Sequence, residues 1–326
     1  MIRTALVTGA NGFVGGHLVA ELERRGARVF ALKRQGSPPG MLSRLKARVV
    51  ELPAFTAEHL AGTVPEGLDA LFHVAGDASF WSGHASRQLD ANVGVTERLI
   101  AEARRRGTRA FVFTSTAGAL GLQPGVLTED SPVTAATSRI AYVRTKHLAE
   151  QLVLAATDLN PVVLNPGTII GPDNPGYWGR VFQMVEAGRL TFVPKGQTSF
   201  ADVQQVARAH VEAVERGARG ERFLLGGADA TFREAITVAS RLCGRTGAVR
   251  EAPAFALWLM GLLGEGLALL TRNEPLMTRQ GAEYLMHRNR VSSRKAIDRL
   301  DYRPVPLEEM LSRTHAWYRE WSSTRR

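Results

Sequence analysis

Cysteine is almost absent from this chain of 326 residues, which contains only Cys243. A single thiol excludes both a disulfide within the chain and a cysteine-rich metal site. Cys243 ends the apolar helical stretch that begins at Ile236, where a buried structural thiol is the ordinary case. The histidines His73, His84 and His147 show no metal-ligand spacing, so we interpret them as structural or surface residues and predict no metal site.

Acidic residues are also in deficit, with 31 Asp and Glu against 41 Lys and Arg, which gives a formal net charge of +10. A basic balance can indicate a nucleic acid, a membrane surface or an anionic ligand as partner. The basic residues are scattered, and the densest run, Arg104 to Arg106, lies at the end of a predicted helix, where cations complement the helix dipole. Aromatic–basic interleaving and zinc-finger spacing are both missing, so we expect no nucleic-acid partner.

Segments that would direct the chain to a membrane are scarce. The one long apolar run, Ala252 to Leu270, is interrupted by Pro253, Glu265 and glycines, whereas a spanning helix needs about 20 apolar residues without a mid-span carboxylate. We interpret it as a helix packed over the substrate pocket and expect no stable membrane insertion. A peripheral membrane contact stays open as an alternative for a lipid substrate. The chain starts directly with a predicted strand, Thr4 to Thr8, so we expect no signal peptide and a cytoplasmic location.

The first two-thirds of the chain alternates short apolar strands with amphipathic helices. Nearly continuous apolar strands separated by helices indicate a parallel sheet covered on both faces, so we expect an α/β fold with a doubly wound parallel sheet. The expected strands are Ala5–Thr8, Val29–Leu32, Val49–Leu52, Ala70–Val74, Phe111–Thr114 and Val162–Asn165, and the clearest helices are Val14–Arg25, Val93–Arg106 and Tyr142–Ala156.

A glycine-rich turn joins the first strand to the first helix. Gly9 permits the tight turn, Gly12 lets the backbone approach a pyrophosphate, and Gly15 lets the helix pack closely on the strand. The helix N-terminus offers unpaired N–H groups and the positive end of its dipole to phosphates. Strand, turn and helix in this order predict a Rossmann dinucleotide site formed by Gly9, Asn11, Gly12, Phe13, Val14 and Gly15.

The end of the second predicted strand bears on which dinucleotide is bound. An acidic residue there would hold the two ribose hydroxyls of NAD, but the sequence has Lys33 and Arg34 instead. A guanidinium fork matches the geometry of a 2′-phosphate. We therefore favour NADP(H), with NAD as the alternative; the structural alternative is that both side chains are simply solvated.

The chain becomes irregular from about Pro166, with Gly- and Pro-rich loops, one more expected strand at 223–225, and a mostly helical C-terminal third. We expect residues 1–166, with a return segment at about 199–226, to form the NADP-binding Rossmann domain. We expect residues 167–198 and 227–326 to form a smaller, mostly helical substrate-binding domain.

Tyr142 and Lys146 are the candidate catalytic pair. They stand four apart on a predicted helix, so both face one side. A nearby ammonium favours the phenolate and brings the tyrosine pKa from near 10 toward working pH, which would let Tyr142 donate or remove a proton. Such pairs are common on helix surfaces, but here the pair follows a phosphate turn and a Ser/Thr-rich strand end.

These features resemble the extended short-chain dehydrogenase/reductase superfamily, in particular its dihydroflavonol-reductase and 3β-hydroxysteroid-dehydrogenase branch. The resemblance covers nearly the whole chain and is ordered along it. The matching segments after the glycine turn are Phe72–Gly76, Asp90–Val93, Phe113–Gly118, Tyr142–Lys146, Asn165–Pro172, Ser199–Val203 with Val206–Ala209, and Ser293–Ala296 with Leu300–Pro304.

The resemblance implies roles for residues that spacing alone does not assign. It places a hydroxyl that polarises a substrate carbonyl at Thr116, with Ser115 as the fallback, and both have strand-end capping as their ordinary alternative. Asn92 would brace the site, or simply cap a helix. Lys146 would bind the nicotinamide ribose. Further cofactor contacts would come from Val74, Ala75, Gly76, Thr114, Tyr142, Pro166, Gly167 and Thr168.

Two positions depart from the family's pattern. After the third strand the family usually has Gly-Asp, whose carboxylate holds the adenine, and this chain has Leu52-Pro53-Ala54-Phe55. Gly76 stands where many members have alanine.

The branch that the chain resembles suggests hydride transfer between NADP(H) and a secondary alcohol or ketone of a fairly apolar small molecule. The alternatives are a nucleotide-sugar epimerase or dehydratase with tightly bound cofactor and, from a different class, a non-catalytic NADP sensor, which would usually lack Tyr142 and Lys146. The candidate substrate residues are Ser79, Phe80, Trp81 and Tyr177. The helices 93–106 and 142–156 correspond to the dimer helices of the family, so we expect a homodimer.

Overall fold

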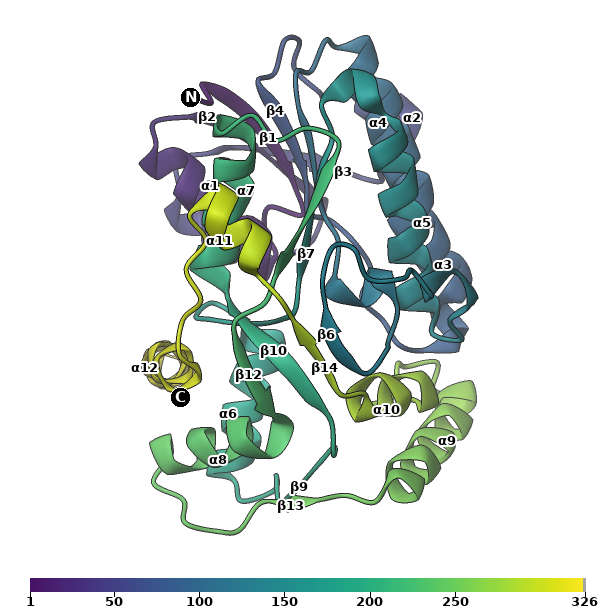
Figure 1. Ribbon diagram of the computed structural model, residues 1–326, viewed down its shortest axis with the longest axis vertical. Helices are drawn as coiled ribbons and strands as arrows, with labels where there is room; N and C mark the ends of the chain where they lie inside the picture. The colour runs from purple at the N-terminus through teal and green to yellow at the C-terminus, as the bar shows by residue number, and fades with distance from the viewer. Residues whose placement is uncertain (325–326) are drawn as a thin grey trace.

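The computed structural model describes residues 1–324 and centres on a seven-stranded sheet whose neighbouring strands all run parallel (Figure 1). The strand order is β11-β7-β5-β4-β1-β2-β3. Apolar runs supply these strands because a strand covered on both faces is buried on both faces. The expected doubly wound parallel sheet is confirmed. Its strands are β1 (Thr4–Thr8), β2 (Arg28–Arg34), β3 (Arg48–Leu52), β4 (Ala70–His73), β5 (Phe111–Thr114), β7 (Val162–Pro166) and β11 (Glu221–Leu225).

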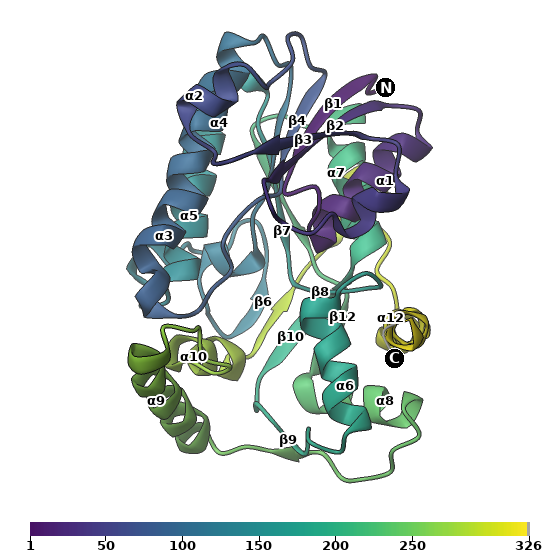
Figure 2. The ribbon, with the colours of Figure 1, turned by 180° about the vertical axis from the view of Figure 1, so that it is seen from behind.

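Helices cover both faces of this sheet (Figures 1 and 2). One core, which contains Leu18, Val206 and Phe223, lies under α1 (Phe13–Arg24), α7 (Val203–Glu215) and α11 (Arg294–Leu300). The core of the other face contains Leu99 and Val153, and it lies under α2 (Ala57–Ala61), α4 (Val95–Arg105) and α5 (Ala141–Ala155). The chain enters α4 through α3 (Ala85–Leu89) and the π-helical turn η3 (Asp90–Gly94). Short 3-10 turns are η1 (Gly40–Arg44), η2 (Ser82–His84), η4 (Ala117–Leu120), η5 (Ala135–Thr137) and η6 (Thr157–Leu159).

A second, smaller part lies beyond the carboxyl ends of the large sheet (Figure 1). Its three-stranded sheet has the order β12-β10-β8, and its core contains Trp178, Phe182 and Phe200. We expected residues 199–202 in the return segment of the nucleotide domain, but they pair in β10 of this smaller sheet. The rest of the return segment contributes β11 to the large sheet and α7, which packs on that sheet. The elements are β8 (Thr168–Ile170), β10 (Gln197–Asp202), β12 (Ala228–Thr231), α6 (Arg180–Glu186), α8 (Phe232–Leu242), α12 (Leu307–Ser323) and the π-helical turn η7 (Pro175–Gly179).

Two strand pairs link distant parts of the chain. Strand β9 (Phe192–Val193) pairs with β13 (Arg250–Glu251), and β6 (Gly125–Leu127) pairs with β14 (Asn289–Val291). The second pair joins the C-terminal segment to the loop that follows β5. It therefore carries the preceding helix α10 (Arg279–Met286) to the edge of the sheet where β4, β5 and β7 end.

Helix α9 (Ala254–Thr271) is more exposed than its sequence-based interpretation implied. We expected the apolar run to be packed over the substrate pocket; Ala254 and Trp258 line a cavity, but only 22% of the run is buried. Helix α9 packs on α10 through a stripe of buried residues that includes Leu257, Gly261 and Ala268. The eight residues of α10 cover one side of α9. Among residues 1–324, α9 is the one helix long and apolar enough to cross a membrane by length and composition.

Candidate active site

The turn after β1 is held in a single shape by close backbone contacts. Gly9 has a φ of +63°, and a Cβ there would lie 2.8 Å from the backbone of Ala75. A Cβ on Gly15 would lie 2.1 Å from the Gly9 carbonyl oxygen, so α1 packs directly on the turn. The Thr8 hydroxyl accepts hydrogen bonds from the backbone N–H groups of Val74 and Ala75, both at 3.2 Å. The glycine turn and the end of β4 therefore form one rigid unit.

The N-terminus of α1 is open to an anion. Its N-cap, Gly12, supplies no side-chain hydrogen bond, and the first turn has no acidic residue. The first N–H groups of a helix have no partner within the helix, and the dipole places positive charge there. The predicted residues Phe13 and Val14 form this first turn, and the Asn11 side chain ties the turn to Pro38 with a hydrogen bond of 2.9 Å. These residues fit the pyrophosphate of a dinucleotide.

The two basic residues at the end of β2 lie in different environments. Lys33 is buried, its ammonium is 2.7 Å from a carboxylate oxygen of Glu51 on β3, and it donates to the Ser37 carbonyl at 3.0 Å. Arg34 is exposed and makes no side-chain hydrogen bond or ion pair with the residues that the structure describes. Of the two predicted phosphate ligands, Arg34 is therefore the one with an uncommitted charge.

The adenine side of the site lacks the family's carboxylate, as the sequence of 52–55 indicated. Leu52 at the end of β3 is buried, and its carbonyl accepts the N–H of Gln35 at 2.7 Å. The Phe55 carbonyl accepts from Arg98 at 2.8 Å. The backbone of this segment is thus used to join β3 to β2 and α4.

Asn92 braces the loop after β4 rather than capping a helix. It lies inside η3 and is 1% exposed. Its amide oxygen accepts the N–H of Asp77 at 2.8 Å, and its amide nitrogen donates to the Asp77 carbonyl and the Thr145 hydroxyl, both at 3.0 Å. A Cβ on Gly76 would lie 3.1 Å from the Asn92 amide oxygen and 3.8 Å from the Lys146 nitrogen, so the loop runs directly beside Lys146.

Lys146 is buried between two strand-end groups of β5. Its ammonium donates to the Thr114 carbonyl at 2.6 Å and stands 4.0 Å from the centre of the Phe113 ring. Burial lowers the pKa of Lys146 to about 7, and the carboxylate of Glu150, one turn later on α5, acts in the opposite direction. The side-chain hydroxyl of Thr114 is engaged elsewhere, at 2.8 Å from a ring nitrogen of His210.

Glu150 is fully buried and contacts residues of three neighbouring segments, the end of β5, β7 and the first half of β11. One carboxylate oxygen accepts from the Ser115 hydroxyl and from the Asn165 amide, both at 2.8 Å, and the other is 2.9 Å from the Arg222 guanidinium on β11. Ser115, the fallback catalytic residue of the sequence, therefore points its hydroxyl into the structural core. Asn165 also donates to the Thr116 carbonyl at 3.0 Å, so the same cluster fixes the backbone next to the candidate catalytic hydroxyl.

Tyr142 faces Thr116 and a second tyrosine, Tyr284 of α10. Burial and the neighbouring Tyr284 raise the pKa of Tyr142, whereas the Thr116 hydroxyl lowers it. The sequence-based expectation of a pKa brought down by Lys146 is therefore wrong for this structure, because burial outweighs it. The same Thr116 hydroxyl lowers the pKa of Tyr284, whose burial raises it. The two tyrosine rings are 6.4 Å apart, so Tyr284 belongs to the site. The sequence analysis missed it because it lies 142 residues after Tyr142 (284 − 142) and stands in no recognisable motif.

The candidate substrate residues are only partly brought together. Phe80 lies between the two tyrosines, with ring centres 5.4 Å from Tyr142 and 4.7 Å from Tyr284. Ser79 instead donates to Glu274 at 2.6 Å, and Trp81 packs edge-on against His84 at 4.5 Å. Tyr177 lies half exposed on η7 with its ring 5.7 Å from that of Trp178, and burial together with the nearby Tyr284 raises its pKa, so it lies close to the second tyrosine of the site.

The loop after β7 lies on the other side of Thr116. Gly167 donates its N–H to Leu225 at 3.0 Å, and a Cβ on it would lie 2.3 Å from the Ser199 carbonyl oxygen. Pro166 ends β7, and the hydroxyl of Thr168 is 3.1 Å from that of Thr198. A narrow cavity opens here, lined by Thr116, Ala117, Gly118, Leu122, Gly167, Thr168, Gln197, Thr198, Phe232, Tyr284, His287, Asn289 and Val291.

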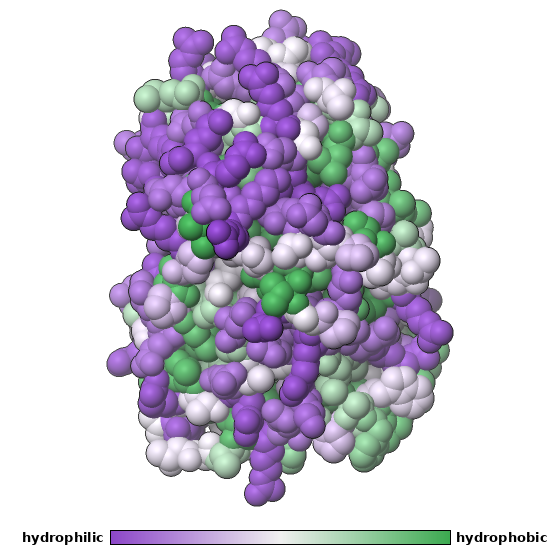
Figure 3. Space-filling model, viewed as in Figure 1, coloured by the Kyte–Doolittle hydropathy of each residue, from purple (hydrophilic) through white to green (hydrophobic). Residues whose placement is uncertain are grey.

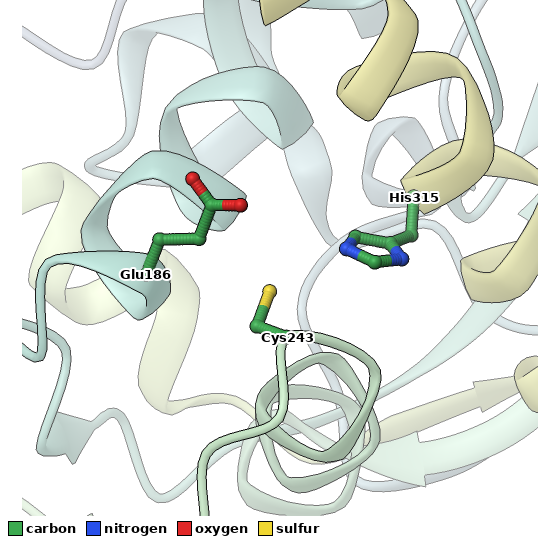
Figure 4. A group of neighbouring side chains, drawn as sticks. All are labelled: Glu186, Cys243 and His315. Atoms are coloured by element: carbon green, nitrogen blue, oxygen red, sulfur yellow. The ribbon is translucent and has the colours of Figure 1, made fainter.

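A separate group of side chains lies between α6, α8 and α12 (Figure 4). Glu186, Cys243 and His315 each have one atom of a kind that can bind a metal ion, and these three atoms lie within 4.8 Å of one another. Cys243 is half-buried at the C-cap of α8, and burial raises its thiol pKa to about 11. The Glu186 carboxylate already accepts the hydroxyl of Tyr318 at 2.8 Å. Sequence spacing did not show this group, and the absence of a metal site stays a prediction.

Comparisons with known proteins agree over almost the whole chain. The sequence model described as the NAD dependent epimerase/dehydratase family matches residues 5–226. A sterol demethylase protein B of Methylococcus capsulatus is 30% identical over 97% of this chain and 98% of its own length. A 2-alkyl-3-oxoalkanoate reductase of Stenotrophomonas maltophilia is 31% identical over 95% and 98%, and a putative dihydroflavonol 4-reductase of Synechocystis is 25% identical over 96% and 93%. The crystal structure of gox2253 matches with a TM-score of 0.80 at 30% identity and covers 98% of each chain.

The turn geometry predicts that Gly9→Ala damages the protein in two ways. The substitution places a side chain at a φ of +63° and 2.8 Å from the Ala75 backbone, so we expect a loss of about 2 kcal/mol or more in the free energy of unfolding and at least tenfold weaker dinucleotide binding. Gly26→Ala is the matched control, because Gly26 has a φ of +80° and nothing within 4 Å. It carries the backbone strain without the collision, and we expect a loss of about 1 kcal/mol with unchanged binding. Urea denaturation and calorimetric titration measure both quantities, and equal effects of the two variants would contradict the close-contact argument.

Proposed function

The chain belongs to the NAD dependent epimerase/dehydratase family, and from that premise we propose that it is an NADP(H)-dependent reductase of apolar ketones, with Tyr142 as the proton donor. The cofactor, when bound, supplies the hydride. We propose that residues 1–166, with the return segment at about 199–226, form the nucleotide-binding domain, and that the remainder of the chain forms the substrate-binding domain, which would cover a substrate held at Thr116 and Tyr142.

The observation that carries this proposal is the chemistry around Thr116 and Tyr142. The narrow cavity beside them is lined by hydroxyl, amide and apolar groups, and its lining includes no lysine, arginine, aspartate or glutamate among residues 1–324. A nucleotide sugar carries a diphosphate, which proteins usually bind with basic side chains. An uncharged carbonyl compound needs only hydroxyl donors and apolar contacts. The lining thus favours a ketone over a sugar nucleotide.

Tyr142 carries the proton that reduction of a ketone consumes. Burial and Tyr284 raise its pKa, so the phenol is protonated near neutral pH. In ketone reduction the carbonyl carbon receives a hydride and the oxygen receives the Tyr142 proton, which gives a secondary alcohol. Thr116 would donate a hydrogen bond to the same oxygen and stabilise the charge that develops on it. Phe80, packed on both tyrosines, would exclude water.

Lys146 and its neighbours would position the reacting groups. Its ammonium donates a hydrogen bond of 2.6 Å to the Thr114 carbonyl, which fixes its position. Lys146 lies on the same face of α5 as Tyr142, and a nicotinamide ribose bound there would accept a hydrogen bond from it. A lysine whose pKa is about 7 is present both as ammonium and as neutral amine near neutral pH, so it can release and take up a proton. Ser115, which binds Glu150, is proposed as a positioning residue, and Thr116 as the catalytic hydroxyl.

The relatives support an apolar substrate. Two of them are named for a 2-alkyl-3-oxoalkanoate and for a sterol, and each aligns with at least 95% of this chain. We propose a substrate of the same general chemistry, a ketone flanked by alkyl or ring carbons. By the same resemblance we propose a homodimer formed through α4 and α5, and a cytoplasmic location.

Net oxidation of NADPH in the presence of apolar ketones tests the reaction. We expect loss of absorbance matched by an equal amount of secondary alcohol, because a reductase consumes its hydride donor. Binding of NADPH without net consumption on any ketone, together with interconversion of sugar nucleotides, would replace the proposal with an epimerase. Binding without turnover on either panel would indicate a sensor.

The assignment of the proton donor predicts unequal effects of two tyrosine variants. Tyr142→Phe should lower kcat by about 10³-fold and leave the Kd for NADPH unchanged, because it removes the acid but keeps the ring. Tyr284→Phe is the matched control, since it keeps the packing on Phe80 and should change kcat less than about tenfold. Steady-state kinetics and cofactor titration measure both. A larger loss in Tyr284→Phe would move the proton donor to α10.

The uncommitted charge of Arg34 predicts the cofactor preference. Arg34→Ala should raise the Kd for NADPH by about 10- to 100-fold and leave that for NADH unchanged, because a guanidinium pairs with a 2′-phosphate and NADH has none. The control is Arg48→Ala, an exposed arginine at the opposite end of the neighbouring strand. Tighter binding of NADH than NADPH by the unchanged protein would overturn the preference and leave NAD as the cofactor.

A further inference from the structure

Helix α9 presents a face without any charged group. Its one charged residue, Glu265, is buried toward α10, where its carboxylate accepts from the backbone and the side chain of Arg279, each at 2.8 Å. Apart from Thr271 at the end, the outward side consists of apolar side chains and glycine. The exposed large side chains are Phe255, Trp258, Leu259, Met260, Leu262, Leu263, Leu267, Leu269 and Leu270, and Leu276 follows the helix.

This face lies at one extremity of the molecule. In Figures 1 and 2, α9 lies at the outer edge of the molecule beside α10. Figure 3, which has the view of Figure 1, shows hydrophobic residues at the lower right, where Figure 1 places α9. Leu263 is 66% exposed, Leu269 79% and Leu270 84%, so these are whole side chains in contact with solvent. A contiguous apolar surface of this kind usually marks a contact with a protein or a membrane.

The chemistry of α9 favours a lipid surface over a second copy of the chain. Its outward face is a strip about 27 Å long that has no hydrogen-bonding side chain apart from those of Trp258 and the terminal Thr271. Protein interfaces also carry a polar rim with hydrogen bonds, which this strip lacks. A bilayer needs only apolar side chains with tryptophan and arginine at their margin.

Such marginal residues are present. Trp258 is half exposed on α9, and Arg250 and Arg272 are exposed just before and just after the helix. The chain carries a formal net charge of +10, which complements an anionic membrane. Because Glu265 is paired inside the protein with Arg279, α9 stays packed on α10, and it would lie in the plane of the membrane surface rather than cross it.

A cavity beneath α9 leads toward the catalytic residues. It has a volume of about 510 Å³, and its walls combine the apolar residues Ala254 and Trp258 of α9 and Ala282 and Met286 of α10 with the charged residues Arg139, Glu265, Arg279 and Glu283. His287 lines both this cavity and the narrow one beside Thr116 and Tyr284, so the two are adjacent. Gln280, another wall residue, accepts the N–H of Ala141, which immediately precedes Tyr142.

We propose that α9 docks on the surface of a lipid bilayer and that the cavity beneath it admits a membrane-dissolved apolar ketone to Tyr142. The route of entry rests on the proposed function, whereas the docking of α9 does not. A ketone with a long alkyl chain or fused rings partitions into lipid, so an entry that opens at the bilayer would spare it the transfer into water.

Sedimentation with vesicles tests the docking of the full chain. We expect binding to vesicles of phosphatidylcholine containing phosphatidylglycerol, and weaker binding to phosphatidylcholine alone. The triple variant Leu263→Gln, Leu267→Gln and Leu270→Gln should lower the partition coefficient at least about 100-fold, because three exposed leucines of one helix face no longer enter the lipid. The matched control, Leu89→Gln, Val133→Gln and Ile297→Gln, removes three exposed apolar side chains elsewhere and should bind like the unchanged chain.

Either of two results would overturn docking: no binding by the unchanged chain to either vesicle, or equal binding by the two triple variants. A mass in solution that halves in the α9 variant, with no vesicle binding, would assign the face to a second copy instead. The entry route is tested by kinetics with NADPH. The α9 variant should have a raised KM for a ketone delivered in vesicles and an unchanged KM for a water-soluble ketone. Absence of all turnover with intact vesicle binding would remove the reductase proposal and leave docking in place.

Discussion

A buried carboxylate holds the catalytic end of this molecule together. Glu150 is removed from water on α5, and a charge in that position is tolerated only when it is paired and hydrogen-bonded. Its partners are Ser115 directly after β5, Asn165 in β7 and Arg222 near the start of β11, so it joins three neighbouring strands of the sheet. Satisfying this one group fixes the helix that carries Tyr142 and Lys146 against the strand ends that carry Thr116 and the loop over it.

The same arrangement sets the electrostatics of the site. Lys146 is one helical turn from Glu150, so it is close enough for the carboxylate to favour its charged form, while burial favours the neutral form and prevails. Tyr142 lies one turn further toward the start of the helix, where burial together with the second phenol, Tyr284, raises its pKa. Burial thus favours the neutral form of both side chains, which leaves Tyr142 with a proton that it can donate.

The C-terminal segment completes the site from the opposite side. Strand β14 pairs with β6, and this pairing carries α10 and Tyr284 to Thr116 and Phe80. Helix α10 covers one side of α9, and the apolar side chains on the other side of α9 are exposed. The contact that adds a second tyrosine to the site therefore also leaves an apolar helix at the surface of the molecule.

The sequence by itself determined the doubly wound sheet and the cofactor turn, because strand burial, glycine conformation and helix dipoles act over a few neighbouring residues. It also singled out Tyr142 and Lys146 by their spacing on a helix after the cofactor turn, and Thr116 by the resemblance to a known family. Only the tertiary structure decided that Ser115 turns to Glu150, that Lys33 is paired with Glu51 and that Tyr284 joins Thr116. It likewise decided that the apolar run of α9 faces outward. The three contacts join residues that are 18 to 168 positions apart in the sequence (51 − 33 and 284 − 116), and no local sequence pattern predicts contacts of this kind.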